Sequence, residues 1–277
     1  MLVSLGLLVS CTPGSQGQGA DAGRFEDAGS DAGDMPLAEQ EPNDGTTLDE
    51  VNDLAVGERV FGNIALDDAD IFRVPTEGGR AYRVHLEVPA GSSLVGHVTV
   101  IDSGRDEEAP GQDYVQLSRD GAQSDVNVEL VAMRAGHLVI VRDARNVGGQ
   151  GAGGDGHGYV LHVEEIDLSL ESEALILPAT VQGELAHAGA MRVYRFSAAN
   201  GMDLVADLQA SGDMDGRLFV VSRTSGDWIA RNDNRSNSDT DPLLDAPLFG
   251  SGEMLLVVDN IAEEAADLGY SLSVSAP

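Results

Sequence analysis

The sequence contains no lysine, and all sixteen of its basic residues are arginine. Aspartate and glutamate number 47 together, so the formal net charge at pH 7 is −31. A surface of this sign repels phosphate backbones, which excludes nucleic acid as a partner. The same charge suits cation binding and equally suits plain solubility, so composition alone leaves both interpretations open.

Aromatic residues make up only 4% of the chain, and Cys11 is the single cysteine. One cysteine excludes an internal disulfide. After Cys11 no stretch of the sequence is long and apolar enough to span a bilayer. The 34 glycines and the few aromatics favour short strands joined by many turns over long helices.

The first ten residues read MLVSLGLLVS, an apolar stretch that ends in a small residue. This pattern is typical of a signal peptide. The run Leu8-Val9-Ser10-Cys11 resembles the lipobox of bacterial lipoproteins, with an ordinary signal peptide as the alternative. The resemblance implies cleavage before Cys11 and lipidation of its thiol. We therefore expect residues 1–11 to be a lipoprotein signal peptide. The lipid would be the only membrane contact, and the location would be the cell envelope, with Thr12 favouring the outer membrane.

Residues 12–36 are rich in Gly, Ala, Asp, Ser and Gln, and the triplet Asp-Ala-Gly begins at Asp21, Asp27 and Asp31. Such a composition buries too little apolar surface to offset the entropy of ordering. We predict a disordered acidic tether that holds the folded part away from the membrane.

Beyond the tether, apolar and polar residues alternate with the period of a half-buried strand, as in residues 82–88. The runs 138–141 and 254–258 are apolar at every position, which indicates central strands. Glycine-containing turns separate these pieces. The sequence therefore predicts an all-β fold of antiparallel sandwiches with almost no helix.

The chain also repeats itself. Val60–Ile64 is an expected strand with a central glycine, and after a turn the next expected strand contains Phe72. In the same way, Val181–Leu185 is followed after a turn by an expected strand that contains Tyr194. Each copy closes on Tyr-x-Leu-x-Val, beginning at Tyr159 and at Tyr270. Matching features in the same order predict two tandem β-sandwich domains, 37–166 and 167–277.

The first copy carries further motifs: Glu41-Pro42-Asn43-Asp44, Phe61-Gly62-Asn63-Ile64, Asp68-Ala69-Asp70-Ile71-Phe72 and Gly158-Tyr159. In this order they resemble the bacterial pre-peptidase C-terminal domain family. The second copy keeps Gly183, Tyr194, Gly252 and Gly269-Tyr270 but lacks both acidic motifs, so it is a weaker match. The resemblance implies a jelly-roll-like β-sandwich of an exported protein. Members of this family bind extracellular polymers such as collagen or polysaccharide, or stabilise a neighbour.

Some members of that family carry calcium at the two acidic motifs. We therefore expect a calcium site in the first copy, with ligands drawn from Glu41, Asn43, Asp44, Asp68 and Asp70; two solvated turns are the alternative. Carboxylate and amide oxygens are the ligands that calcium prefers. In the second copy Arg192 occupies the position that matches Asp70, and its charge would oppose a cation.

Catalytic patterns are missing. None of the six histidines forms His-Glu-x-x-His, and no Gly-x-Ser-x-Gly elbow occurs after the tether. His85 and His162 fall on the polar phase of alternating strands, where we expect them to be exposed and inert. We predict a non-catalytic surface module that binds or adheres to an extracellular protein or polysaccharide. The alternative is an accessory or structural subunit that supports a separate exported enzyme or envelope complex.

Overall fold

The alternation of side chains in the sequence determines which face of each strand is buried. In β5 (Ala81–Glu87), Tyr82, Val84 and Leu86 are buried, whereas Arg83 and His85 are partly exposed. Successive residues of a strand point to opposite faces of its sheet, so one face of β5 lies in a core and the other meets solvent. The computed structural model describes residues 36–41, 51–102, 117–119, 125–133, 135–147, 149–212, 214–236, 239–262 and 267–277.

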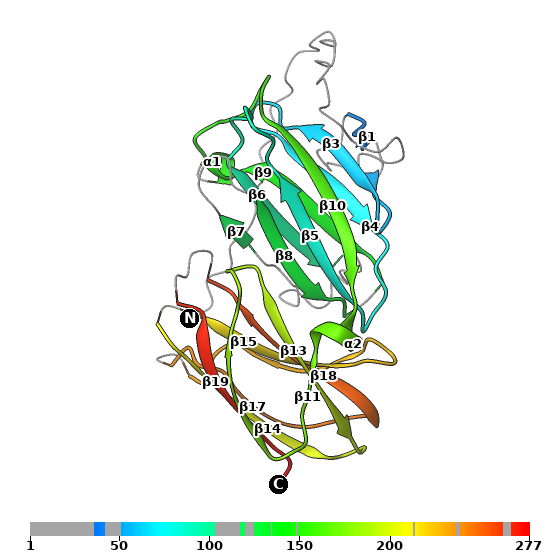
Figure 1. Cartoon of the computed structure of the whole chain (residues 1–277), viewed down its shortest axis with the longest axis vertical. Coiled ribbons are helices and arrows are strands. Elements are labelled where there is room, and N and C mark those ends of the chain that lie inside the picture. The colour runs from blue at the N-terminus through cyan, green and yellow to red at the C-terminus, as the bar shows by residue number, and fades with distance from the viewer. Residues whose placement is uncertain are drawn as a thin grey trace. The chain divides into compact units, whose positions relative to one another are not determined.

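The first half of the described chain forms two five-stranded sheets (Figure 1). One has the order β1-β3-β10-β5-β8 and the other β2-β4-β9-β6-β7. Their strands are β1 (Leu37–Ala38), β2 (Asn52–Asp53), β3 (Arg59–Asn63), β4 (Ala69–Val74), β5, β6 (Gly96–Asp102), β7 (Leu117–Arg119), β8 (Val126–Val131), β9 (His137–Asp143) and β10 (Gly158–Ile166). Apolar side chains from both sheets, such as Leu86, Val141 and Leu161, form one core between them.

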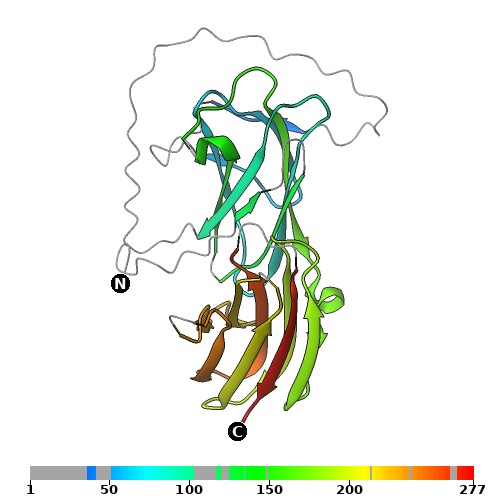
Figure 2. The ribbon, with the colours of Figure 1, turned by 90° about the vertical axis from the view of Figure 1, so that its left-hand side faces the viewer.

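The second half repeats the arrangement with a five-stranded sheet, β11-β13-β18-β15-β16, and a four-stranded sheet, β12-β19-β14-β17. The strands are β11 (Glu173–Ala174), β12 (Ala179–Glu184), β13 (Met191–Ala198), β14 (Asp203–Ala210), β15 (Gly216–Ser222), β16 (Trp228–Asn232), β17 (Leu243–Pro247), β18 (Gly252–Asn260) and β19 (Gly269–Ser275). A second cluster of buried residues, among them Leu208, Leu256 and Leu272, lies between these sheets. Figure 2 shows this half, coloured from yellow-green to red, turned by 90° from the view of Figure 1.

Both halves share one strand order. When β3 to β10 and β12 to β19 are each counted from one to eight, both halves give sheets 1-8-3-6 and 2-7-4-5. Two interlocked four-stranded sheets of this kind form a jelly roll. The expected all-β fold of two tandem, jelly-roll-like antiparallel sandwiches is confirmed. Strand β1 is the exception to the symmetry, because β12 has β19 as its only partner strand among the described residues.

The repeated glycine and tyrosine lie directly opposite each other on neighbouring strands. Tyr159 of β10 pairs with Gly62 of β3, and Tyr270 of β19 pairs with Gly183 of β12. A β-carbon at either glycine would overlap the ring of the opposite tyrosine. Each glycine therefore gives its tyrosine the room to fold across the sheet toward the core.

The two runs that are apolar at every position form central strands. Residues 138–141 lie in β9, between β4 and β6, and residues 254–258 lie in β18, between β13 and β15. Among the described residues the helices are two single turns, α1 (Ala144–Val147) and α2 (Leu168–Glu171). No helix in the described ranges is long and apolar enough to cross a membrane.

The predicted domain boundary near Asp167 falls between β10 and α2, where the Asp167 carboxylate caps the helix by accepting the Ser169 main-chain N–H at 2.8 Å. Contacts between residues nevertheless join Pro36–Pro277 into one compact unit. The predicted signal peptide, Cys11 and nearly all of the predicted tether (residues 12–35) lie outside the described residues.

Candidate cation site in the first sandwich

Strand β1 brings two glutamates to one edge of the first sandwich. It runs parallel to β3, with Leu37 opposite Val60. The Glu39 main-chain N–H continues this pairing by donating to the Phe61 carbonyl at 3.0 Å. Because alternate residues of an extended segment share a face, Glu39 and Glu41 are placed to meet the same neighbour.

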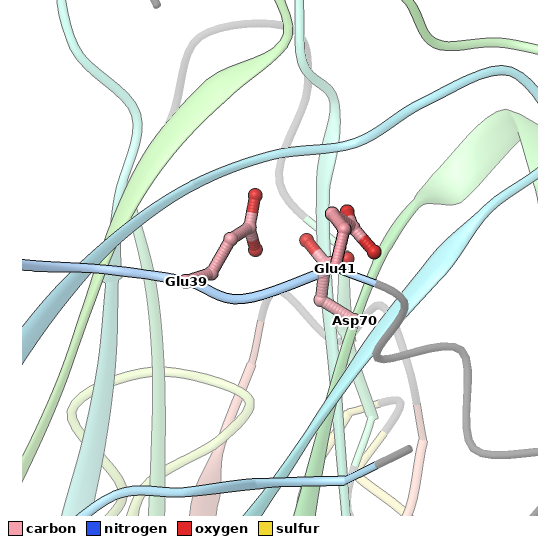
Figure 3. A group of neighbouring side chains, drawn as sticks. All are labelled: Glu39, Glu41 and Asp70. Carbon is pink, nitrogen blue, oxygen red and sulfur yellow. The ribbon is translucent and has the colours of Figure 1, made fainter. Parts of the chain in front are cut away.

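That neighbour is Asp70 of β4, whose side chain is fully buried at 0% exposure. Glu39, Glu41 and Asp70 each contribute a carboxylate oxygen, and the three oxygens lie within 4.8 Å of one another. Figure 3 shows the two glutamates on the chain that follows β1 and Asp70 on a separate strand. Like charges at this separation repel, so the cluster needs a proton or a cation to be stable.

Tyr159 links two of these carboxylates. Its hydroxyl lies 2.5 Å from Asp70 Oδ2 and 2.9 Å from Glu39 Oε2. A phenol carries one proton, so this proton is shared between two acceptors. The other oxygen of Glu39, Oε1, accepts the Asn63 main-chain N–H at 2.6 Å, which fixes the carboxylate against β3.

Burial raises the pKa of Asp70 to about 9, and the negative charge of Glu39 adds to the rise. The pKa of the Tyr159 phenol is also raised well above its usual value, first by burial and then by the charges of Asp70 and Glu39. Without a cation, Asp70 therefore holds a proton at neutral pH. An all-oxygen donor set with a buried carboxylate fits a hard cation such as calcium, which would take the place of this proton.

The structure brings together two of the five predicted ligands, Glu41 and Asp70. The Asp68 carboxylate accepts the Ala69 main-chain N–H at 2.8 Å and contributes to the raised pKa of Asp70, but it is not one of the three clustered carboxylates. Asn43 and Asp44 lie outside the described residues. Sequence reasoning missed Glu39; its position two residues before Glu41 was the available signal.

At the matching positions the second sandwich has an exposed ion pair and a contact between two phenols. Arg192 pairs with Val258 as Asp70 pairs with Val141, which confirms that the two residues are equivalent in the fold. Arg192 lies 3.8 Å from Glu173 in an exposed ion pair. The Tyr270 hydroxyl, equivalent to that of Tyr159, is 2.8 Å from the Tyr194 hydroxyl, so its partner is a neutral phenol rather than a carboxylate.

Strand β1 also forms one wall of a pocket of about 240 Å³ at the edge of the first sandwich. Leu54, Val60 and Phe72 line it with apolar side chains, and Glu39 also lines it. The Asn52 side-chain amide reaches across from β2 and donates to the Gln40 carbonyl at 3.1 Å. Whatever fixes β1 therefore also fixes the shape of this pocket.

No family model matches the sequence. No curated protein matches it either. Among solved structures, the chain is similar to the pre-peptidase C-terminal domain of collagenase from Bacillus anthracis, with 18% identity and a TM-score of 0.33 over 38% of this chain and 95% of that one. It is similar to PliG, a periplasmic inhibitor of g-type lysozyme from Aeromonas hydrophila, with 19% identity and a TM-score of 0.32 over 38% and 96% of the two chains. It is also similar to the tandem CBM51 modules of a family 98 glycoside hydrolase from Streptococcus pneumoniae, with 10% identity and a TM-score of 0.24 over 79% and 84%.

Proposed function

We propose that this chain is a non-catalytic binding module of the cell envelope whose first sandwich holds a calcium ion. The observation that supports a bound ion is the buried Asp70 carboxylate, which lies close to the carboxylates of Glu39 and Glu41. The Tyr159 hydroxyl supplies a single proton to Asp70 and Glu39. Only one of two sandwiches with the same strand order has this cluster in the described residues, so the fold itself does not require it.

Calcium takes six to eight oxygen ligands, more than three carboxylates supply when each binds through one atom. Glu39, Glu41 and Asp70 form the ligand set that the described residues offer. Asp68 and the predicted ligands Asn43 and Asp44 are the candidates for the remaining positions. The ion would neutralise the cluster and fasten β1 to β4, which keeps the adjoining pocket in shape.

The ion is tested by thermal unfolding of the full chain in calcium and in chelator. Calcium at a hundredfold excess over its dissociation constant should stabilise the folded state by about 2.7 kcal/mol, which raises the melting temperature of the first sandwich. Asp70→Asn and Glu41→Gln should abolish this response. Glu173→Gln, an exposed carboxylate of the second sandwich, is the matched control and should leave it intact. The same melting temperature in calcium and in chelator would contradict the proposal.

The partner in this proposal is an extracellular protein or polysaccharide. Two tandem sandwiches in a chain with a net charge of −31 suit adhesion, and an accessory role beside an exported enzyme is the second candidate. Retention of the pure chain on insoluble envelope polymer supports adhesion, whereas recovery of one stoichiometric protein partner supports the accessory role. Turnover of peptide, ester or glycoside substrates by the pure chain would contradict a non-catalytic function.

Attachment through Cys11 belongs to the same proposal. Its support is the sequence Leu8-Val9-Ser10-Cys11 followed by an acidic, glycine-rich segment. The measurement is incorporation of a fatty-acid analogue in bacterial cells that express and export the chain. Cys11→Ser should abolish the labelling, and labelling that persists in this variant rules out the anchor.

A further inference from the structure

Two histidines face each other on the solvent side of the first sandwich. His162 of β10 lies directly opposite His85 of β5 in the antiparallel register. Opposite residues of an antiparallel pair have β-carbons about 4.5–5.5 Å apart and side chains on the same face. The sequence spacing of 77 residues hides this proximity, which only the strand register reveals.

Asp125 adds a carboxylate to this pair. Its Oδ2 lies 3.7 Å from His85 Nε2. Its Oδ1 accepts the main-chain N–H of Val88 at 2.9 Å, so the backbone of the β5 end holds the carboxylate in position. The side chains of His85 and Asp125 are 35% and 50% exposed, which leaves them accessible to a solute from outside.

The positive charges on this face are already neutralised. Arg59, opposite His162 on the other side, donates to the Glu87 carboxylate at 3.0 Å. Arg83, two residues before His85, is paired with Glu129 and with Glu164, each at 2.8 Å. A cation that arrives at the histidine pair therefore meets no uncompensated guanidinium from these two neighbours.

We propose that His85, His162 and Asp125 form a surface site for a divalent transition-metal ion, with zinc as the matching ion. Imidazole nitrogen and carboxylate oxygen are zinc ligands, and three protein ligands leave a fourth position open. His85 Nε2 and Asp125 Oδ2 lie 3.7 Å apart, and His162 lies opposite His85 on the neighbouring strand and is only partly buried, so the site requires the His162 ring to turn toward this pair. The open position can hold water or a donor group from a second molecule.

This site differs in chemistry from the carboxylate cluster at β1. Imidazole favours zinc, copper and nickel over calcium and magnesium, whereas an all-carboxylate site has the opposite preference. The two ions can therefore be measured separately on one chain. The zinc site also does not depend on the calcium proposal, because none of Glu39, Glu41 and Asp70 belongs to it.

The test is a calorimetric titration of the full chain with zinc in an excess of calcium, which occupies hard-cation sites. We expect one zinc ion per chain, and at least about tenfold weaker binding in His85→Gln and in His162→Gln. Asp125→Asn should also weaken binding by about tenfold or more. His187→Gln, a part-exposed histidine of the second sandwich, is the matched control and should bind as the unaltered chain does.

A cobalt titration gives a second readout, since nitrogen and oxygen ligation of cobalt produces visible absorption that simple loss of folding does not. This absorption should disappear in His162→Gln, while the far-UV circular dichroism in chelator stays unchanged. Equal zinc affinity in the double variant His85→Gln/His162→Gln and in the unaltered chain overturns the proposal. An equal loss of affinity in His187→Gln also overturns it.

Discussion

The raised pKa of Asp70 makes the stability of the calcium-free first sandwich depend on pH. In the folded state the pKa is about 9, whereas the ordinary value is 3.8. Below about pH 4 both folded and unfolded chains hold the proton, so this group contributes no pH dependence. Between the two pKa values only the folded state holds it, so the free energy of unfolding falls as the pH rises. Above the folded pKa both states have lost the proton and the decline ends.

The expected slope is that of one proton, so the free energy of unfolding should fall by about 3 kcal/mol between pH 6 and pH 8. Urea unfolding in chelator at a series of pH values measures it. Far-UV circular dichroism follows the unfolding of residues 36–277, which form one compact unit.

Asp70→Asn is the decisive control because it keeps the size of the side chain and removes its titration. The variant should lose the slope that Asp70 contributes while the background from the other acidic residues remains. Saturating calcium should also flatten the slope, because the ion holds Asp70 in its charged form. Parallel pH profiles for Asp70→Asn and the unaltered chain in chelator would refute the assignment of a buried protonated carboxyl.

Four further substitutions test the contacts around the two cores by urea unfolding. Tyr159→Phe removes a hydroxyl shared by two carboxylates and should cost about 1.5–3 kcal/mol, whereas Tyr270→Phe removes a hydrogen bond between neutral phenols and should cost about 1 kcal/mol; equal losses would contradict the difference. Gly62→Ala places a β-carbon against the Tyr159 ring and should destabilise the folded chain by about 1–3 kcal/mol; an unchanged free energy of unfolding would contradict the close approach. Asp259→Asn breaks the buried pair in which Arg217 Nε donates to Asp259 Oδ1 at 2.9 Å. The free energy of unfolding should fall by about 3–5 kcal/mol. A fall of less than about 1 kcal/mol would show that the pair is not desolvated in solution.

Alternation and repetition in the sequence were sufficient to predict the strands and the tandem sandwiches. The reason is physical: side-chain period and turn chemistry are local, and they determine which face of a strand is buried. The central position of residues 138–141 and 254–258 followed from their uniform apolarity. The resemblance of the first copy to a known family supplied the jelly-roll order, which local patterns alone do not determine.

The candidate sites depended on contacts between distant residues, and there the sequence was less informative. Glu39 joins the cluster because β1 pairs with β3. This parallel contact involves only two residue pairs, and no local sequence pattern predicts it. His85 and His162 each fall on the polar phase of their own strand, which by itself indicates inert side chains and does not show that the two lie opposite each other. Register between strands far apart in the chain is set by the whole core, so cross-strand neighbours become visible only in the folded structure.

The attachment of β1 has a mechanical consequence. A pull on the chain N-terminal to Pro36 reaches the first sandwich through β1, which pairs with β3 at only two positions. Beyond them the load falls on Glu39, whose main chain bonds to Phe61 and whose carboxylate bonds to Asn63 and Tyr159. Acidic side chains, and any ion they hold, therefore set the resistance of this end to tension, whereas the described residues of the second sandwich include no counterpart of β1 beside β12.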